Sequence, residues 1–525
     1  GAGASAEALG EAGEAGGDPN LAHEGYDSDL EAEALEDYIR RPDAEFGEAA
    51  RDTLGGRLSS APGEGAPVFP CHDKIKVPAG YETPEDAHEL PSETLRLDCV
   101  HGYRAHDARA NLYFTSQGHA VYHAAAVGVV MDVASRRQRF FQGHTDDILC
   151  LDVTSDGKTV ATGQCGADPA ICVWDAATCK LKCELKGVHQ TAVLALAFSP
   201  DGSRLASVGK DPQHTLAFWD LATGQVLATA ACGPRRVYCL EIDPLGRIVS
   251  GGDGHLKFWE LSNGFLAGQP AQWTGSPGQE GFSPSTVLSL CFTPDGATFA
   301  GTKGGCIYKF EEGGARALKK WGGIHKGSIN ALSFTGEGIL SAGRDGKVLL
   351  FDLFMRPKLE VPMVKVVETV VDEEQQPLAY PEPPSVRSAC YDPASGSLLV
   401  GLKTSEVYIV KARGRDDWKA PGGARLLTCG HAAALDPVTK RMEGEVAGIA
   451  CHPRKGLFVS AGDDRSVRLW SCADRQMVRA RVLRDAARCA SFHPRKDHLA
   501  VGCKGGSILV IDLSTGKSVS SLAAG

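Results

Sequence analysis

The chain has 525 residues, of which 43% are hydrophobic, and a formal net charge of −10. This length allows two or three ordinary domains or one long repeat array, and the composition is that of a globular protein. No apolar run approaches the ~20 residues that span a bilayer, and no secretory signal is present, so we expect no membrane partner. The 17 cysteines include no CxxC pair, which disfavours a disulfide framework or structural zinc and favours a reducing compartment. We expect no cofactor, and the missing initiator methionine predicts a fragment or a trimmed product.

Residues 1–92 form an acidic, low-complexity leader. They contain 21 Asp and Glu against 6 Lys and Arg, a net charge of −15, and such a composition predicts disorder. Within them, Tyr26–Pro42 has the pattern of a short helix that begins at Asp27 or Ser28. We expect this helix to be solvated, and the alternative is a docking peptide for a basic partner. Because the whole chain carries −10, residues 93–525 carry +5.

A repeated unit begins after the leader. Each copy has an apolar run with a Pro/Ser-Asp-Gly turn, a second run ending Ser/Thr-x-Gly, and a third run ending Trp-Asp or a related pair. The first two runs recur at 193–211, 237–254, 287–305, 329–346, 386–404, 446–464 and 487–506. The closing pairs are Trp174-Asp175, Trp219-Asp220, Trp259-Glu260, Phe351-Asp352 and Trp470-Ser471. Their separations of 45 residues (175 to 220) and 40 residues (220 to 260) match a WD40 blade, so the sequence predicts an all-β WD40 β-propeller.

About nine units are present, whereas a single propeller closes at four to eight blades. We therefore expect one propeller of about seven blades followed by the start of a second, truncated one. Long insertions at 357–384 and 411–444 support a boundary near Lys440. The predicted divisions are the leader (1–92), an opening hydrophobic motif with the first blade (93–142), the rest of the first propeller (143–440) and the first blades of a second propeller (441–525).

Several repeat residues are predicted to be structural. His144, Thr162 and Trp174 are spaced to form a buried hydrogen-bond relay within one blade, and the alternative for His144 is a general base. Other units lack the Gly-His pair, since the third begins GVHQ and the fourth CGPRR, so we expect the relay to be degenerate in most blades. The other repeat residues assigned a structural role are Asp175, Trp219, Asp220, Trp259 and Trp470.

The stretch Leu95–Asp132 resembles the hydrophobic motif that begins the propeller region in the echinoderm microtubule-associated protein-like family. The resemblance covers about 430 residues and is closest to the long, multi-unit members. It departs at Cys99, where an aromatic residue is common, and at Ala108, where a cysteine is common. It implies that the motif is structural core. The matching residues are Gly102, Tyr103, Arg104, Asp107, Arg109, Asn111, Leu112 and the apolar run 124–130.

Catalytic patterns are missing from the sequence. It contains no GxxxxGK[ST] or HExxH, and no GxSxG in a strand-turn-helix setting. The Gly-rich stretches 301–305 and 502–506 fall at the same turn of two units, which indicates tight hairpins. We therefore expect a binding protein and no enzyme activity.

The resemblance implies tubulin or microtubules as partner, a place in the cytoplasmic cytoskeleton or the axoneme of a cilium or flagellum, and other axonemal or cytoskeletal proteins as further partners. Basic loop residues would meet the acidic tubulin surface, although each also fits an ordinary solvated turn. The rival hypothesis is a general WD40 scaffold for soluble proteins that does not bind tubulin. The pI of about 5.9 and the lack of interleaved aromatic residues argue against nucleic acid. The candidate tubulin contacts are Arg136, Arg137, Arg139, Arg235, Arg236, Arg316, Lys319, Lys320, Arg454 and Lys455, with Arg495 and Lys496 in a second HPRK turn.

Overall fold

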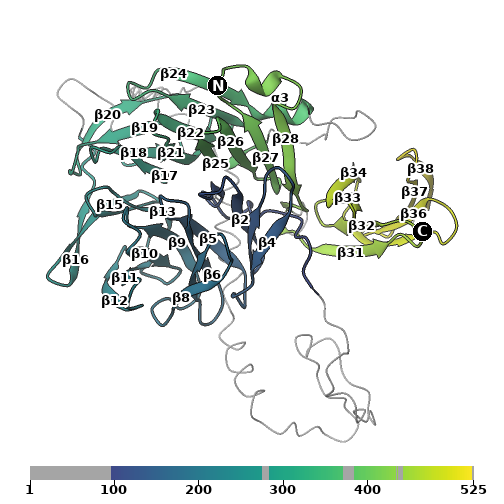
Figure 1. Ribbon diagram of the computed structural model, residues 1–525, viewed down its shortest axis with the longest axis horizontal. Helices are drawn as coiled ribbons and strands as arrows, with labels where there is room; N and C mark the ends of the chain where they lie inside the picture. The colour runs from purple at the N-terminus through teal and green to yellow at the C-terminus, as the bar shows by residue number, and fades with distance from the viewer. Residues whose placement is uncertain (1–95, 275–282, 370–383, 433, 436–441, 523–525) are drawn as a thin grey trace, which may run out of the picture.

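The computed structural model describes residues 96–274, 283–369, 384–432, 434–435 and 442–522 (Figure 1). The predicted leader, its disorder, its helix at 26–42 and the boundary at Lys440 lie outside these residues. The described chain forms nine four-stranded antiparallel sheets, here called blades 1 to 9 in chain order, and one two-stranded hairpin. The prediction of an all-β propeller fold is confirmed.

Seven blades occupy residues 113–429. Blade 1 contains β1 (Tyr113–Phe114), β2 (Ala120–Ala124), β3 (Val127–Met131) and β4 (Gln138–Phe141). Blade 2 contains β5 (Ile148–Val153), β6 (Thr159–Gln164), β7 (Ile171–Asp175) and β8 (Leu181–Leu185). Blade 3 contains β9 (Val193–Phe198), β10 (Arg204–Gly209), β11 (Thr215–Asp220) and β12 (Val226–Ala231). Blade 4 contains β13 (Val237–Ile242), β14 (Ile248–Gly252), β15 (His255–Ser262) and β16 (Phe265–Pro270).

The ring continues with three more blades of the same strand order. Blade 5 contains β17 (Val287–Phe292), β18 (Thr298–Thr302), β19 (Ile307–Phe310) and β20 (Ala317–Trp321). Blade 6 contains β21 (Ile329–Phe334), β22 (Ile339–Gly343), β23 (Lys347–Phe351) and β24 (Pro357–Pro362), and is followed by the helix α3 (Met363–Thr369). Blade 7 contains β25 (Val386–Asp392), β26 (Ser397–Leu402), β27 (Glu406–Lys411) and β28 (Ala424–Cys429), with the 3-10 turn η2 (Asp417–Lys419) before β28.

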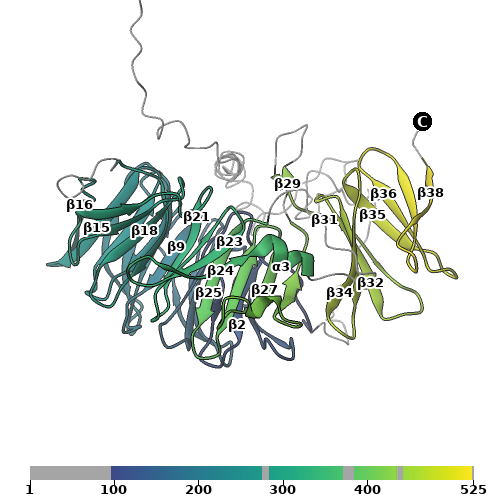
Figure 2. The ribbon, with the colours of Figure 1, turned by 90° about the horizontal axis from the view of Figure 1, so that it is seen from above.

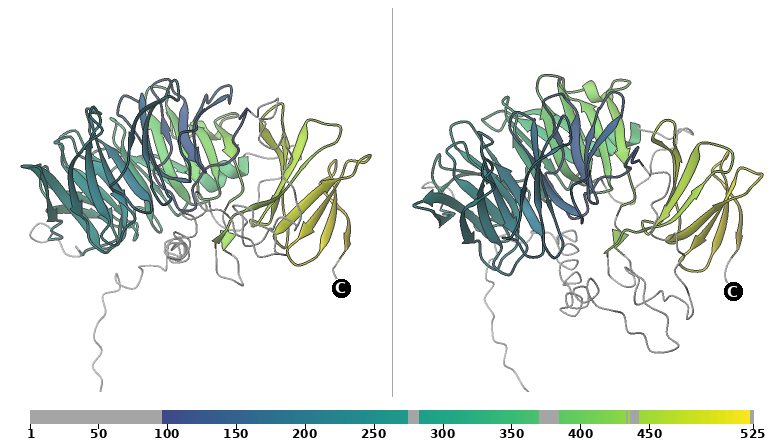
Figure 3. Two further views of the ribbon diagram at one scale, coloured as in Figure 1. Left: turned by 90° about the horizontal axis from the view of Figure 1, so that it is seen from below. Right: turned by 60° about the horizontal axis from the view of Figure 1, so that its bottom comes forward.

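Two further blades follow the hairpin of β29 (Ala434–Leu435) and β30 (Met442–Glu443). Blade 8 contains β31 (Val446–Cys451), β32 (Leu457–Gly462), β33 (Ser466–Ser471) and β34 (Gln476–Val482). Blade 9 contains β35 (Ala487–Phe492), β36 (His498–Cys503), β37 (Ile508–Asp512) and β38 (Ser518–Leu522). These two blades pack on each other through β31 and β35 and stand beside the ring (Figures 2 and 3).

The ring closes without the last two blades. The inner strands β5, β9, β13, β17, β21 and β25 contact one another in order, and β25 returns to β1. The core lies between the faces of neighbouring sheets. For example, Phe218 of blade 3 belongs to one apolar cluster with Leu240 and Trp259 of blade 4. Each blade is therefore stabilised by burial against the next one, as expected for a sheet that cannot cover its own apolar faces.

Strand direction gives the ring two distinct faces. In every blade, the turns joining the first strand to the second and the third to the fourth lie on one side. The turns joining the second strand to the third lie on the other side, together with the links between blades. We call the second side the connection face and the first side the opposite face.

A β-bulge recurs in the inner strand of blades 2 to 9, one residue from its start. Such a bulge leaves one residue out of the ladder and re-aims its side chain. In the ring these bulges lie on the connection face, where the inner strands surround the central channel. In the ring, the bulge residues are Leu149, Leu194, Tyr238, Leu288, Asn330 and Arg387.

Candidate functional site

The opening motif fastens blade 1 to blade 7. The Tyr103 hydroxyl lies 2.9 Å from Ser388 Oγ on β25 and is also hydrogen-bonded to Asn111 Oδ1. Asn111 Nδ2 donates to the Arg104 carbonyl at 2.7 Å. Burial raises the pKa of the Tyr103 phenol, which therefore keeps its proton. The Gly102 N–H donates to Thr428 Oγ1 at 3.4 Å, a second link to blade 7.

The motif also reaches blade 2. Arg104 is 7% exposed, and its Nε and Nη2 donate to the two carboxylate oxygens of Asp107 at 2.8 and 2.7 Å. Its Nη1 donates to Asp147 Oδ2 at 2.7 Å, in the link that leads into β5. Such charge-assisted, bidentate pairs fix geometry as well as adding energy. The buried Arg104 thus joins the motif to the next blade.

Arg109 crosses the mouth of the channel. Its Nε donates to Asn330 Oδ1 of blade 6 at 3.4 Å, and its guanidinium lies 5.6 Å from the centre of the Tyr238 ring of blade 4. The neighbouring Ala110 N–H donates to the Arg387 carbonyl of blade 7 at 3.4 Å. One motif residue therefore meets bulge residues from distant blades. Gly102, Tyr103, Arg104 and Arg109 thus contact other blades, while Asp107 holds the Arg104 guanidinium.

The predicted relay forms in blade 2. His144 Nε2 lies 2.7 Å from Thr162 Oγ1, and Trp174 Nε1 donates to the same oxygen at 3.1 Å. His144 Nδ1 lies 2.8 Å from Gln164 Oε1. Burial lowers the pKa of His144, so its ring is neutral and can donate from one nitrogen while accepting at the other. Because both ring nitrogens of His144 are hydrogen-bonded, this geometry does not support His144 as a general base.

Related relays form in other blades, and the expectation for the GVHQ unit is wrong. His189 of that unit lies 2.7 Å from Ser207 Oγ, to which Trp219 Nε1 donates at 2.8 Å. In both blades 18 residues separate the histidine from the hydroxyl, so the spacing positions the ring although glycine no longer precedes it. Blade 8 repeats the arrangement with His431, Ser460 and Trp470 at 2.7 and 2.8 Å.

Blades 4 and 6 carry variants of the relay. In blade 4 the histidine comes from the third strand, where His255 Nε2 lies 2.8 Å from Ser250 Oγ and Trp259 donates to the same oxygen at 2.9 Å. In blade 6, His325 Nε2 lies 2.9 Å from Ser341 Oγ, and Phe351 stands where blades 2, 3, 4 and 8 have tryptophan. The hydrogen bonds of these histidines and hydroxyls stabilise single blades.

The acidic residue after tryptophan stabilises the following turn. Asp175 Oδ1 accepts from the Thr178 N–H at 2.9 Å, and Asp220 Oδ1 accepts from the Thr223 N–H at 2.8 Å. Hydrogen bonds from the threonine side chain and backbone lower the pKa of both carboxyls, which remain ionised.

The ten candidate tubulin contacts are not brought together. Those on the opposite face are Arg136 and Arg137 of blade 1 and Arg316 of blade 5, while Arg454 and Lys455 lie in the first turn of blade 8, outside the ring. Those on the connection face are Arg235 and Arg236, between blades 3 and 4. Those on outer strands are Arg139 of β4 and Lys319 and Lys320 of β20.

Several of these side chains make contacts of their own. Arg136 Nη2 donates to the Leu426 carbonyl at 3.0 Å, and Arg316 pairs with Glu311 at 3.3 Å. The Lys319 ammonium lies 4.8 Å from the Trp321 ring centre. Arg137, directly before β4, is exposed. The set therefore combines packed and solvated residues and does not define one surface.

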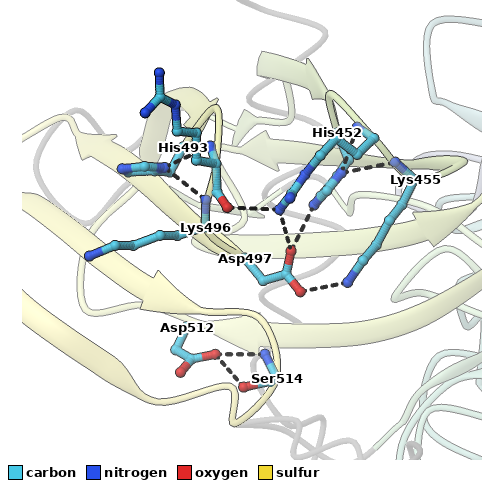
Figure 4. Close-up of polar contacts among 9 residues, drawn as sticks. His452, Lys455, His493, Lys496, Asp497, Asp512 and Ser514 are labelled. Carbon is cyan, nitrogen blue, oxygen red and sulfur yellow. Dashed lines mark hydrogen bonds and ion pairs between the residues drawn. The ribbon is translucent and has the colours of Figure 1, made fainter.

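The two HPRK turns fasten blades 8 and 9 to each other (Figure 4). His452 Nε2 lies 3.3 Å from Asp497 Oδ1, and Lys455 Nζ donates to Asp497 Oδ2 at 2.6 Å. Arg454 Nη2 donates to the Arg495 carbonyl at 2.9 Å. The hydrogen bond from Lys455 holds the pKa of Asp497 below its usual range. These basic residues thus have a packing role as well as charge.

Two carboxyl groups line the ring interior. Asp152 on β5 accepts the Phe198 N–H at 2.8 Å, and burial raises its pKa to about 6. Burial and the nearby Asp152 charge raise the pKa of Glu241 on β13 well above its usual value. The described residues contain no group of three or more His, Cys, Asp or Glu that could hold a metal ion. No helix among them is long and apolar enough to cross a membrane.

A cavity of about 680 Å³ separates the opening motif from blade 8. Two ion pairs lie in its lining: Arg104 binds Asp147 at 2.7 Å, and Arg488 lies 3.0 Å from Asp463. At its edge, the His101 ring lies 4.3 Å from the Trp470 ring, so the motif also contacts blade 8. These contacts around the cavity favour a junction between the opening motif and blade 8.

Sequence reasoning missed one set of half-buried cations. They directly follow the second strand in blades 3, 5, 6 and 7, on the connection face. Each is a single residue far from the next in sequence, so no charge run reveals them. Their shared position within the repeat was the signal that could have identified them. They are Lys210, Lys303, Arg344 and Lys403.

Three family models match the chain. The model of the echinoderm microtubule-associated protein first beta-propeller matches residues 137–378, and the HELP motif model matches residues 90–129. The model of the WD domain, G-beta repeat, matches residues 437–471. The solved structure of the computationally designed Ika8 protein covers 78% of this chain and has 98% of its own length covered. Its TM-score of 0.37 and 19% identity are too low to add to this result.

Known relatives align over most of the chain. "Echinoderm microtubule-associated protein-like 2" of Rattus norvegicus is 32% identical over 442 residues, which cover 81% of this chain and 62% of the relative. The "77 kDa echinoderm microtubule-associated protein" of Strongylocentrotus purpuratus is 29% identical, covering 82% and 58%. "Echinoderm microtubule-associated protein-like 1" of Homo sapiens is 28% identical, covering 81% and 49%. The chain thus spans about half to three fifths of these relatives. Its opening motif, its propeller and these alignments agree, and the chain belongs to the echinoderm microtubule-associated protein-like family.

Proposed function

We propose that this chain is a non-enzymatic, microtubule-associated WD40-propeller protein that binds tubulin through charged loops of the propeller. The observation that carries the proposal is the match to family members over 81% of the chain, which includes both the opening motif and the propeller. The names of these relatives describe microtubule association. We place the protein in the cytoplasmic cytoskeleton, with the axoneme of cilia or flagella as a specific site and other cytoskeletal proteins as further partners.

The architecture suits binding by shape and charge. A ring whose blades are fastened by buried hydrogen bonds and ion pairs presents its loops on a rigid frame, and binding residues usually lie on such loops. Residues 93–525 carry +5, so an acidic lattice would attract them, and salt would weaken the attraction. In this proposal, the domain divisions predicted from the sequence comprise an acidic leader and the remaining domains, which bind tubulin. No cofactor is needed for such an interaction.

The leader works against this attraction. Its net charge of −15 exceeds the positive charge of the body. It would therefore weaken association with an acidic lattice wherever it approaches the contact, and neutralising it should strengthen binding. The rival function, a scaffold for soluble proteins without tubulin binding, predicts no such effect on microtubules.

Co-pelleting with taxol-stabilised microtubules tests the proposal. The full chain should pellet at low salt and progressively less as the salt concentration rises. A leader variant with Glu31, Glu33, Glu36 and Asp37 changed to their amides should pellet more strongly. If the folded chain stays in the supernatant at every salt concentration, the tubulin-binding proposal fails and the scaffold function takes its place.

A further inference from the structure

The two HPRK turns of blades 8 and 9 have the same internal construction. His452 Nδ1 accepts the N–H groups of Arg454 and Lys455, both at 3.1 Å. In the second turn, His493 Nδ1 accepts the two corresponding N–H groups at 3.0 and 2.9 Å. A hydrogen bond from Arg454 Nη2 to the Arg495 carbonyl, at 2.9 Å, joins the turns. Four basic side chains therefore extend from two fixed turns that lie side by side.

These turns carry more positive than negative charge. Arg454 and Lys455 share one carboxylate, Asp497, at 3.5 and 2.6 Å, and their side chains are still 55% and 50% exposed. Arg495 and Lys496 are exposed, and neither side chain has an ion-pair partner among the residues that the structure describes. Figure 4 shows the Lys496 amine pointing away from Asp497. Four cations and one carboxylate leave a surplus of three positive charges.

The neighbouring turns do not remove this surplus. In blade 8, the turn between the third and fourth strands carries Asp474 and Arg475. The corresponding place in blade 9 has Asp512 and Lys517. Each of these turns adds one charge of either sign, so the surplus stays with the HPRK turns.

The chain enters the folded body beside these turns. Asp98, close to the start of the described residues, lies 2.8 Å from Arg475 Nε of blade 8. The Cys472 N–H donates to the Gly456 carbonyl at 2.9 Å, which places the Arg475 turn next to the first HPRK turn. The residues that precede Asp98 therefore begin within reach of the HPRK turns.

Residues 82–93 come shortly before this entry point and are acidic. At about 3.4 Å per residue, an extended chain of this length spans roughly 40 Å. A short tether gives an effective concentration in about the millimolar range, which populates contacts between exposed ions that are too weak to hold separate molecules together. The segment contains no Lys or Arg, and its carboxylates are Glu82, Glu85, Asp86, Glu89 and Glu93.

We propose that residues 82–93 dock on the two HPRK turns of blades 8 and 9 and mask their positive charge. Carboxylates of the segment form ion pairs with Arg495 and Lys496 and with the exposed sides of Arg454 and Lys455. The chain's own segment is favoured over a separate partner because it is tethered next to this surface and carries the complementary charge. An acidic partner reaches the turns only when the segment leaves them. The contact lies within one chain, so the inference does not depend on tubulin binding.

Zero-length carbodiimide cross-linking of the full chain, followed by mass spectrometry, tests the inference. This reagent joins a carboxylate to a lysine amine only when the two are in contact. We expect Lys455 and Lys496 to be linked to carboxylates of residues 82–93 in the monomeric protein. The yield should fall at least about threefold between low salt and about 0.5 M salt, because exposed ion pairs are screened.

A pair of variants tests the surface. The turn variant, Arg495→Gln with Lys496→Gln, removes the two unpaired charges and keeps Lys455 as the cross-linking site. The matched control, Lys180→Gln with Lys326→Gln, removes two exposed charges from the ring. We expect links to Lys455 to fall about threefold or more in the turn variant and less than about 1.5-fold in the control. Circular dichroism would verify that both variants fold.

A second pair of variants tests the segment, with a labelled peptide of the sequence 82–93 as probe. Fluorescence polarisation should show at least about fivefold tighter binding of this peptide to the segment variant than to the parent chain, because the turns are no longer occupied. The gain should disappear when the turn variant is added. The matched control is the leader variant at residues 31, 33, 36 and 37, which should change the affinity less than about twofold. The segment variant carries Glu82→Gln, Glu85→Gln, Asp86→Asn and Glu89→Gln.

Four results would overturn the inference. One is linkage of the two lysines to residues 24–37, or to no carboxylate of the leader. Another is linkage found only in dimers, with a yield that rises with protein concentration, because a second copy would then supply the segment. The third is equal loss of links in the turn variant and its control, which would mean a general charge effect. The fourth is equal peptide affinity of the parent chain and the segment variant, because the turns would then be open to a separate partner.

Discussion

Thr162 is the hub of the best-formed relay, and replacing it by valine tests whether these hydrogen bonds hold the blade. Its Oγ1 lies 2.7 Å from His144 Nε2 and 3.3 Å from the Cys172 carbonyl, and it accepts from Trp174 Nε1 at 3.1 Å. Thr162 and Trp174 are fully buried, and His144 is 8% exposed. Valine keeps the shape but leaves the ring nitrogens of His144 and Trp174 without their shared partner.

Each buried polar group that loses its partner costs about 1–3 kcal/mol. Two such groups predict a loss of about 2–6 kcal/mol in the free energy of unfolding for Thr162→Val. Thr162→Ser is the matched control. It keeps the hydroxyl, as Ser207 and Ser460 do in their own blades, and should lose about 1 kcal/mol for the missing methyl group.

Urea unfolding followed by tryptophan fluorescence measures both variants, and an unchanged slope shows that the midpoints report stability. If Thr162→Val lost no more than Thr162→Ser, the relay would contribute nothing beyond packing. The conclusion that these buried hydrogen bonds stabilise the blade would then be wrong for this protein.

Three further predictions follow from other contacts. Arg104→Gln leaves the Asp107 carboxylate without its bidentate partner and should lower the free energy of unfolding by about 3 kcal/mol in the same urea assay; an unchanged midpoint would contradict the role of Arg104. Because burial raises the folded-state pKa of Asp152 to about 6, its contribution to stability is present below about pH 4 and lost as the pH rises through 6. Asp152→Asn should therefore raise the melting temperature at pH 8 more than at pH 4, and an equal shift at both would refute this. An added Cβ at Gly401 would lie 2.6 Å from the Tyr103 hydroxyl, so Gly401→Ala should cost about 1–3 kcal/mol, whereas Gly304→Ala, with open space around it, should be neutral.

The fold was predictable because its signals are local. A Trp-Asp pair and a Pro-Asp-Gly turn each report on a few neighbouring residues, and their period of 40 to 45 residues repeats along the chain. The relay was harder, because it depends on contacts between strands. His189 reaches Ser207 without a preceding glycine, and His255 reaches Ser250 from a different strand altogether. Hydrogen-bond geometry, and not the dipeptide, decides which histidines take part.

The half-buried cations of the connection face were not predictable from charge runs along the sequence. Lys210, Lys303, Arg344 and Lys403 are tens of residues apart, and only the repeated blades place them at equivalent positions of one face. Conversely, the adjacent pairs of basic residues that are conspicuous in the sequence lie in different parts of the structure. Arg235 and Arg236 lie on the connection face, whereas Arg454 and Lys455 pack against blade 9. A circular fold brings together residues at the same repeat position, and sequence neighbours need not share a surface.

The most direct test of the central claim is co-pelleting of the full chain with taxol-stabilised microtubules across a salt series. The account predicts binding at low salt that declines as the salt concentration rises. A folded chain that never pellets with microtubules would contradict it.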